Sequence, residues 1–263
     1  MVTEKMDDTD IANQPAHWLL ANLGKRVLRP GGKELTLSLL DALEIDSEDD
    51  VIEFAPGVGF TAERVFDCEP QSYTGIDLSR EAVADLESKF GGPGREFIVG
   101  NAANAELSDE AADVVYGEAM LTMHPDDGKA SIVEEAFRLL RSGGRYGIHE
   151  LGLTPDDLDE ETKTTIQRDV AGATNVNARP QTVAEWVELL ESAGFSVTWQ
   201  STAPMHLLEP RRVLADEGVL GTLKFGFNVL THPTARERVR ELRGAFTEHE
   251  HHMNAIALVA EKP

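Results

Sequence analysis

The sequence predicts an α/β fold, in which a doubly wound, mainly parallel sheet is covered by helices on both faces. Short apolar runs alternate with helical patterns over the first 200 residues, which is typical of repeated β-α units. Each run is too short to form a helix of ordinary length. The runs expected as strands are residues 51–54, 73–76, 96–100, 113–117, 145–151 and 195–200, with a last run at 255–260.

The helices expected between these strands have recognisable ends. Ser79 is suited to cap a helix that stops at Gly91, because its hydroxyl can accept a backbone N–H and glycine ends helices readily. Thr182 and Glu185 have the spacing of a capping box, and Gly194 follows as the stop signal. The sequence therefore marks helices as clearly as strands.

Two stretches fall outside the repeat and predict a cap over one edge of the sheet. Residues 9–44 look helical with a break at 29–32, and residues 204–248 separate the sixth apolar run from the last. The expected organisation is 1–46 as N-terminal helices and cap, 47–203 with 249–263 as the ligand-binding domain, and 204–248 as a helical cap insert.

The charge balance excludes several classes of partner. The chain has 24 Lys plus Arg against 47 Asp plus Glu, a net charge of −23. Such a surface repels nucleic-acid phosphates and anionic membranes. We expect no nucleic-acid partner, and a salt-adapted host is a hypothesis that fits this charge, because salt screens self-repulsion.

The compartment is expected to be the cytoplasm. Cys68 is the single cysteine, which excludes an intramolecular disulfide and fits a reducing environment. The first ten residues are too acidic for a signal peptide, and no apolar run approaches the roughly 20 residues of a membrane span. No stable membrane anchor is therefore expected.

A glycine-rich turn after the first strand predicts a nucleotide-type ligand. Gly57 and Gly59 allow a tight turn and close approach of the backbone. Asp77, at the end of the second strand, could accept hydrogen bonds from both hydroxyls of a ribose. This pattern also fits an NAD-binding turn, but Glu53 would repel a pyrophosphate and attract an amino group.

With these motifs, the chain resembles the class I S-adenosylmethionine-dependent methyltransferases, particularly small-molecule enzymes that methylate quinone precursors. The matching segments are EFAPGVG, YTGIDLS, FIVGNAANAEL, DVVYGEAMLTMHPDD and LLRSGGRYGIHEL, in the family's order over residues 51–151. The resemblance implies a Rossmann-like sheet of seven strands, the last of them antiparallel. It also implies S-adenosylmethionine as cofactor and methyl transfer as activity.

The resemblance assigns the cofactor site residue by residue. In it Glu53 would meet the methionine amino group and Asp77 would hold the ribose. Asn101 stands where the family has an acidic residue beside the adenine, and it keeps an acceptor oxygen. Ala55 and Pro56 replace the family's more usual Gly and Cys. The complete set is Glu53, Ala55, Pro56, Gly57, Gly59, Asp77, Leu78, Asn101, Ala102, Glu118, Ala119 and Met120.

The candidates for catalysis lie at strand ends on the cofactor side. They are His124 after the fourth strand, His149 and Glu150 in the fifth, and His206 at the start of the cap insert. A general base is needed only if the acceptor loses a proton, and an imidazole suits that task near neutral pH. The alternative is that His124 caps the next helix and His149 is packed, as strand-end histidines often are.

An apolar or amphiphilic acceptor is expected from the composition of the cap. The side chains expected to line its pocket are Leu207, Leu208, Leu220, Phe225 and Phe227, with Trp18 and Leu19 from the N-terminal helix. The alternative is that these residues only bury the cap against the sheet. No metal site is expected, because HEHHM at 249–253 lacks the HExxH spacing of a zinc helix.

The leading hypothesis is methyl transfer from S-adenosylmethionine to a small, apolar or amphiphilic metabolite. A nicotinamide-dependent oxidoreductase and a non-catalytic cofactor-binding protein on the same scaffold remain as alternatives. The expected partner is the small-molecule acceptor, and a homodimer is left open.

Overall fold

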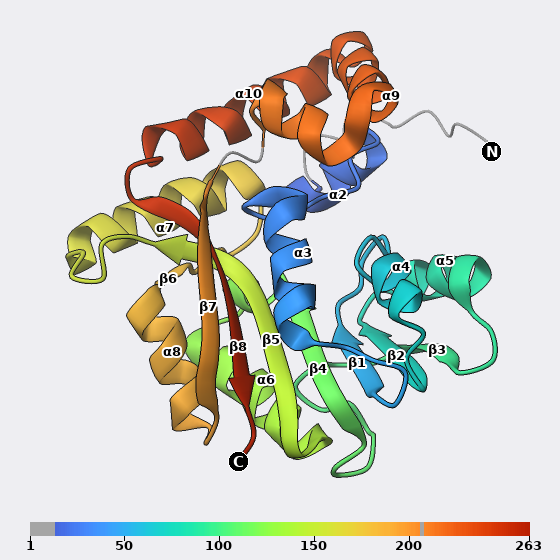
Figure 1. Cartoon of the computed structure of the whole chain (residues 1–263). Coiled ribbons are helices and arrows are strands. Elements are labelled where there is room, and N and C mark those ends of the chain that lie inside the picture. The colour runs from blue at the N-terminus through green and yellow to red at the C-terminus, as the bar shows by residue number, and fades with distance from the viewer. Residues whose placement is uncertain (1–13, 206–207) are drawn as a thin grey trace.

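The computed structural model describes residues 14–205 and 208–263 and contains one mainly parallel sheet (Figure 1). The strand order is β3-β2-β1-β4-β5-β8-β7, and β8 alone runs antiparallel to its neighbours. The strands are β1 Asp50–Phe54, β2 Ser72–Asp77, β3 Arg95–Val99, β4 Ala112–Glu118, β5 Leu140–Leu153, β6 Gln181–Thr182, β7 Ser196–Pro204 and β8 Met253–Glu261. The predicted seven strands and antiparallel last strand are confirmed, and the two-residue β6 is an addition that pairs with β5.

Helices cover both faces of this sheet. The helices of the described residues, including those of the cap, are α2 Ala16–Asn22, α3 Gly32–Leu43, α4 Ala62–Val65, α5 Arg80–Phe90, α6 Asp126–Leu139, α7 Glu160–Thr174, α8 Val183–Ser192, α9 Pro210–Thr231 and α10 Pro233–Glu248. Short 3-10 turns occur at η1 Phe66–Cys68 and η2 Leu121–Met123. Among residues 14–205 and 208–263, no helix has both the length and the apolar character that a membrane span requires.

The predicted helix ends form as the side-chain chemistry requires. The Ser79 hydroxyl accepts the backbone N–H of Ala82 at the start of α5. At the start of α8, Thr182 and Glu185 exchange both hydrogen bonds of a capping box. These local contacts satisfy backbone donors that the first helical turn leaves free.

Two hydrophobic cores lie on opposite faces of the sheet. One packs α6 and α8 against it, with Phe54 and Trp186 fully buried. The other packs α3, α4 and α5 against it, with Leu39 and Tyr73 buried. The sheet is therefore buried on both sides, as a doubly wound parallel sheet requires.

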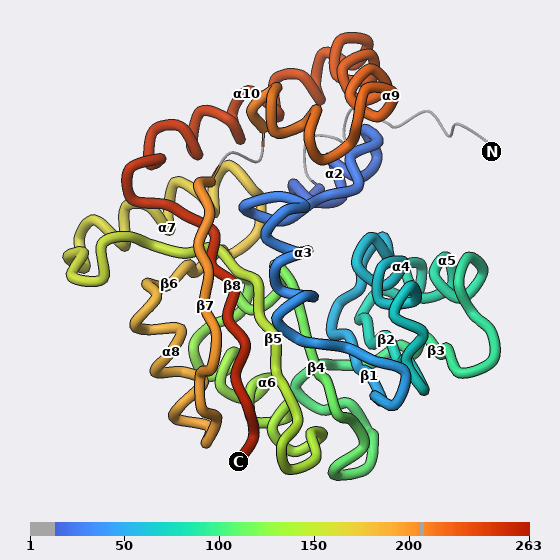
Figure 2. The backbone as a smooth tube through the Cα atoms, in the orientation of Figure 1, coloured from blue at the N-terminus to red at the C-terminus, as the bar shows by residue number. Residues whose placement is uncertain are grey.

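A third core holds the cap together at the carboxyl ends of the parallel strands (Figures 1 and 2). It joins α2, α7, α9 and α10 through residues such as Leu20, Ile166 and Leu242. The patterns above predict no element for residues 160–174, but Asp159 caps α7 there by accepting the N–H of Thr162. The cap thus covers the sheet edge where α/β proteins bind ligands.

Candidate functional site

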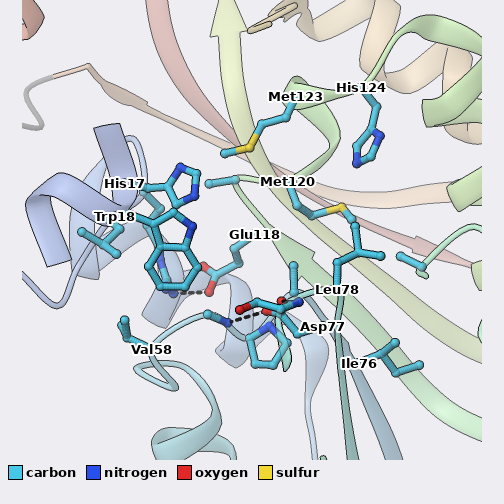
Figure 3. Close-up of a pocket in the computed structure, with 18 of the residues that line it drawn as sticks. His17, Trp18, Val58, Ile76, Asp77, Leu78, Glu118, Met120, Met123 and His124 are labelled. Atoms are coloured by element: carbon cyan, nitrogen blue, oxygen red, sulfur yellow. Dashed lines mark hydrogen bonds and ion pairs between the residues drawn. The ribbon is translucent and has the colours of Figure 1, made fainter. Parts of the chain in front are cut away.

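A cavity of about 310 Å³ opens at the carboxyl ends of β1, β2 and β4 (Figure 3). The strand order reverses at β1, which pairs with β2 on one side and β4 on the other, and this is where doubly wound sheets leave a crevice. Ten of the twelve residues assigned to the cofactor line it: Ala55, Pro56, Gly57, Asp77, Leu78, Asn101, Ala102, Glu118, Ala119 and Met120. Glu53 and Gly59 do not.

The two glycines of the turn have different roles. Gly57 has φ of 58° and borders open space, so its backbone faces the cavity in a conformation that glycine adopts at no steric cost. A Cβ on Gly59 would lie only 2.6 Å from Leu86 and 2.7 Å from Phe90 of α5. Gly59 therefore allows α5 to pack closely and does not line the cavity.

The Asp77 carboxylate is fixed by the backbone around it. One oxygen accepts the N–H of Gly57 at 3.2 Å and the other accepts the N–H of Ser79 at 2.8 Å. Each oxygen keeps capacity for a further hydrogen bond. Asp77 therefore stabilises the turn and also presents acceptors to the cavity.

Glu53 lies behind the cavity wall. Its side chain is buried and accepts hydrogen bonds from the hydroxyls of Tyr73 and Tyr116 on the neighbouring strands. Burial raises its pKa to about 7, although the tyrosine hydrogen bonds oppose the shift. The Glu53 carboxylate therefore does not face the cavity. This geometry supports neither the predicted contact with a ligand amino group nor the predicted repulsion of a pyrophosphate.

Glu118 is the buried carboxylate that does line the cavity. It pairs with Arg29 and accepts the hydroxyls of Thr61 and Thr36. Although burial alone would raise its pKa, Arg29 and the hydrogen bond from His149 hold that pKa at about 2. Glu118 is thus ionised and neutralised by Arg29, a residue of the cavity wall that the sequence patterns did not single out.

His149 is part of this buried network. Its Nδ1 lies 2.8 Å from the Glu118 carboxylate and its Nε2 lies 2.6 Å from the carbonyl oxygen of Pro30. Both ring nitrogens are therefore occupied by contacts within the protein. The ring is fully buried and does not line the cavity, so the geometry does not support the predicted catalytic role of His149.

Glu150 is also fully buried, and the structure gives it a structural role instead of the predicted catalytic one. Its carboxylate accepts the backbone N–H groups of Met120, Leu121 and Thr122 at 2.8 to 3.0 Å, and the hydroxyl of Thr122 at 2.7 Å. Glu150 therefore holds the η2 turn, which carries residues of the cavity wall.

Two other imidazoles do reach the cavity (Figure 3). His124 lines it as predicted, and burial followed by the charge of Lys129 lowers its pKa. His17 of α2 was not predicted; its pKa is lowered by burial against the attraction of Asp77. His206 lies outside the described residues. His17 and His124 are therefore the described histidines that line the cavity, and their lowered pKa keeps both rings mostly neutral near pH 7.

Several wall residues were not assigned to the site by sequence reasoning, although five of them, Val58, Ile76, Ser79, Gly100 and Met123, lie within the motif segments. The unassigned residues are His17, Leu28, Arg29, Val58, Ile76, Ser79, Gly100 and Met123, while Trp18 had been expected in the acceptor pocket. His17 and Trp18 come from α2, far from the motifs in sequence, and their rings lie 5.3 Å apart. The break at RPGG, which follows Leu28, was the signal available for that segment.

An apolar cavity of about 80 Å³ adjoins the first one. The two share four residues, His17, Leu28, Ala119 and Met123. The rest of its wall comes mainly from α2, from the end of α7 and the segment after it, from α10 and from β5. It includes Leu20, Leu151, Thr174, Val176, Ala178, Met205, Leu242 and Phe246. The two cavities therefore meet beside His17.

The residues predicted for the apolar pocket are not the ones that line it. Leu220 and Phe227 point outward and are 83% and 67% exposed. Leu208 and Phe225 are buried in the cap core, as is Leu19, and Leu207 lies outside the described residues. The composition of the cap thus predicted an apolar pocket, but the fold lines it with residues of α2, β5, α7 and α10 and not with those of α9.

Comparisons with known proteins agree with this geometry. The family model described as "Methyltransferase domain" matches residues 51–144. An uncharacterized protein of Haemophilus influenzae is 31% identical over 257 residues, which cover 95% of this chain and 99% of that protein. A phthiotriol/phenolphthiotriol dimycocerosates methyltransferase of Mycobacterium ulcerans is 35% identical over 75 residues, 28% of this chain and 27% of its own length.

One solved structure shares the fold over its whole length. It is an S-adenosylmethionine-dependent methyltransferase of Geobacter sulfurreducens in complex with S-adenosyl-L-homocysteine. The TM-score is 0.69 at 18% identity, with 96% of this chain and 100% of that chain covered. At 18% sequence identity, this similarity is evidence of a shared fold alone.

Proposed function

The chain belongs to the class I S-adenosylmethionine-dependent methyltransferases, and from this premise we propose that it methylates a small apolar or amphiphilic metabolite. S-adenosylmethionine is the cofactor, and it supplies a methyl group on a sulfonium centre. Family membership decides against the nicotinamide-dependent alternative. The observation that carries the acceptor class is the apolar cavity that meets the cofactor cavity beside His17.

The cavity residues fit the cofactor by their chemistry. Asp77 is proposed to accept the ribose hydroxyls, since it lines the cavity and each of its oxygens accepts only one backbone N–H and retains acceptor capacity. Ile76, Leu78 and Ala102 offer apolar surface suited to an adenine ring. Gly57 leaves room for close approach of the backbone. Asn101, Ala119 and Met120 complete the proposed binding set, while Glu53 and Gly59 support it from behind.

The acceptor is proposed to occupy the apolar cavity with its reactive atom near the shared wall. Methyl transfer needs an attacking atom aligned with the methyl group, and positioning of this kind accounts for up to roughly 7–11 kcal/mol of a reaction barrier. Residues such as Leu242 and Phe246 exclude water around the acceptor. An apolar wall has little to offer a strongly hydrophilic acceptor.

His17 and His124 are the proposed proton acceptors if the acceptor atom loses a proton. Burial lowers the pKa of both imidazoles, so that both are mostly neutral near pH 7. A neutral imidazole with an accessible nitrogen is able to take a proton during attack. His17 is the better placed, because it lines both cavities and His124 lines only the first.

The acceptor class is tested by narrowing the apolar cavity from its far wall. Ala178 is buried and lines that cavity alone, so Ala178→Leu should lower kcat/KM for apolar acceptors about tenfold or more by occupying their space. The measurement is transfer of a tritiated methyl group from S-adenosylmethionine to apolar phenols, quinols and amines, with glycine as a hydrophilic acceptor.

The control variant is Ala84→Leu, which adds the same group at an exposed position on α5. Both variants should bind S-adenosylhomocysteine as the unmodified chain does. The proposal would be contradicted if glycine were the only acceptor methylated, or if kcat/KM for the apolar acceptors were the same in Ala178→Leu as in the unmodified chain.

A further inference from the structure

Helix α9 carries an apolar surface that no other described element covers. Gly218, with φ of 68° and ψ of −178°, kinks the helix. Around and after the kink, five large apolar side chains point outward. We call them the α9 stripe, and each is between 65% and 83% exposed: Val219, Leu220, Leu223, Phe227 and Leu230. Scattered exposed leucines are ordinary, but a continuous row of this kind marks an interaction surface.

The spacing within the stripe is that of a helix-pairing seam. Leu220, Leu223, Phe227 and Leu230 follow one another at intervals of three, four and three residues, which are the a and d positions of a heptad. The five side chains together offer on the order of 600 Å², close to the share of one partner in an ordinary interface. Another helix is therefore the occupant that this pattern favours.

The stripe is held rigidly in place. Just before the kink, the buried carboxylates of Asp216 and Glu217 lie 3.3 and 3.5 Å from the ammonium group of Lys25. After the kink, Phe225 is buried and the Asn228 amide donates to the carbonyl oxygen of Leu23. The outward direction of the stripe thus follows from buried contacts on the opposite face of the same helix.

The charge distribution selects among the possible occupants. Residues 208–252, which contain α9 and α10, hold seven basic and seven acidic side chains, so the whole charge of −23 lies elsewhere in the chain. Helices that bind anionic membranes have a basic excess on their polar face, which this segment lacks. The neutral segment is instead the place where two strongly acidic copies meet with the least repulsion.

We propose that the α9 stripe is the interface of a symmetric homodimer in which α9 packs antiparallel against α9 of a second copy. A two-fold interface uses the same surface twice, so one stripe is enough to build it. Lys224 does not obstruct this packing, because its side chain runs beside Gly24 of its own chain. The proposal does not depend on the methyl acceptor.

The test is sedimentation velocity of the full chain between 1 and 100 µM, in roughly 0.1 M and 2 M KCl. The expected result is a dimer that tightens in the higher salt, where repulsion is screened and apolar association is favoured. Leu223→Ser should raise the dissociation constant at least tenfold, since symmetry makes each substitution count twice. Leu37→Ser removes an exposed leucine from α3 and should leave the dimer unchanged.

Binding of S-adenosylhomocysteine by both variants shows that they are folded. A monomer at 100 µM in both salts overturns the proposal, and so does a dimer indifferent to Leu223→Ser. The proposal is also overturned if the monomeric chain floats with phosphatidylcholine vesicles and Leu223→Ser does not. That result would show that the α9 stripe binds a membrane surface.

Discussion

Glu53 shows how a motif residue can support a site without lining its cavity. Strand register places it beside Gly75 of β2 and Tyr116 of β4, and two tyrosine hydroxyls saturate one of its oxygens. Its pKa of about 7 lies above the ordinary value of 4.5 because burial penalises the charged form. The folded protein therefore takes up a proton that the unfolded chain releases.

This shift makes stability depend on pH between about 4.5 and 7. Since the folded pKa is raised, the contribution of Glu53 is complete below the unfolded value and is lost as the pH rises through about 7. Glu53→Gln removes this dependence. We expect the free energy of unfolding of the unmodified chain, relative to the variant, to fall by on the order of 3 kcal/mol from pH 4.5 to pH 8.

Urea unfolding at a series of pH values measures this difference. Glu48→Gln is the control, because it makes the same change at an exposed carboxylate. The pH profile of this variant should follow that of the unmodified chain. Parallel profiles for Glu53→Gln and the unmodified chain would show that the Glu53 pKa is not raised.

The sequence predicted the residues of the site better than their contacts. Gly57 was recognisable because a tight turn after a strand requires its backbone conformation, and Asp77 because its carboxylate at a strand end can accept hydrogen bonds. The tyrosine partners of Glu53 were not, because they come from separate strands and only the sheet register brings them together. His17 and Arg29 belong to a segment with no motif, and only the cap fold brings them to the cavity.

Among the elements, the η2 turn depends most on a single side chain. The Glu150 carboxylate receives three backbone N–H groups and one hydroxyl from Met120 to Thr122. Burial raises the pKa of Glu150, while those hydrogen bonds lower it. The turn positions Met120 and Met123 in the cavity wall, so the shape of the site follows from a residue of β5.

Replacing this carboxylate by an amide should loosen the turn. Glu150→Gln offers one acceptor oxygen and turns an NH₂ group toward backbone donors, which should lower the free energy of unfolding by about 2–3 kcal/mol. We also expect weaker binding of S-adenosylhomocysteine. Chemical unfolding and calorimetric titration measure the two effects. Glu134→Gln, at an exposed position of α6, serves as the control. Equal free energies of unfolding and equal binding of S-adenosylhomocysteine in the two variants would contradict the role of Glu150 in holding the η2 turn.

Elements with strong local signals were predicted, and those that depend on tertiary packing were not. The α5 and α8 caps are local side-chain chemistry, and their positions were confirmed. Helix α7 has a cap at Asp159 and buried Ile166 and Val170, yet its role in the cap became visible only beside α10. The two residues of β6 gain strand character solely by pairing with β5.

For the molecule as a whole, repulsion within a net charge of −23 destabilises the folded state. Repulsion between carboxylates acts over a Debye length, which is about 10 Å in 0.1 M salt and shortens as salt is added. Raising KCl from 0.1 M to 2 M should therefore raise the unfolding midpoint by about 5–10 °C, equivalent to a few kcal/mol for a chain of this size.

A thermal scan across a KCl series checks this effect. If screening is the cause, most of the increase should occur below about 0.5 M, where the Debye length has already shortened to a few ångströms. A steady rise up to high salt would point instead to strengthened apolar burial, and no rise at all would remove the support for a salt-adapted host.

The ion cluster at the kink of α9 limits how far the protein can be reduced to a minimal catalyst. Lys25 is wholly enclosed, and its counter-charges belong to the cap. A shortened chain without α9 and α10 would leave Lys25 without the carboxylates that neutralise it and would expose apolar side chains of α2 and α7, such as Leu20 and Ile166, to water. The cap and the rest of the fold therefore form one folding unit, and an engineer seeking a smaller enzyme must first redesign the surface that α9 and α10 cover.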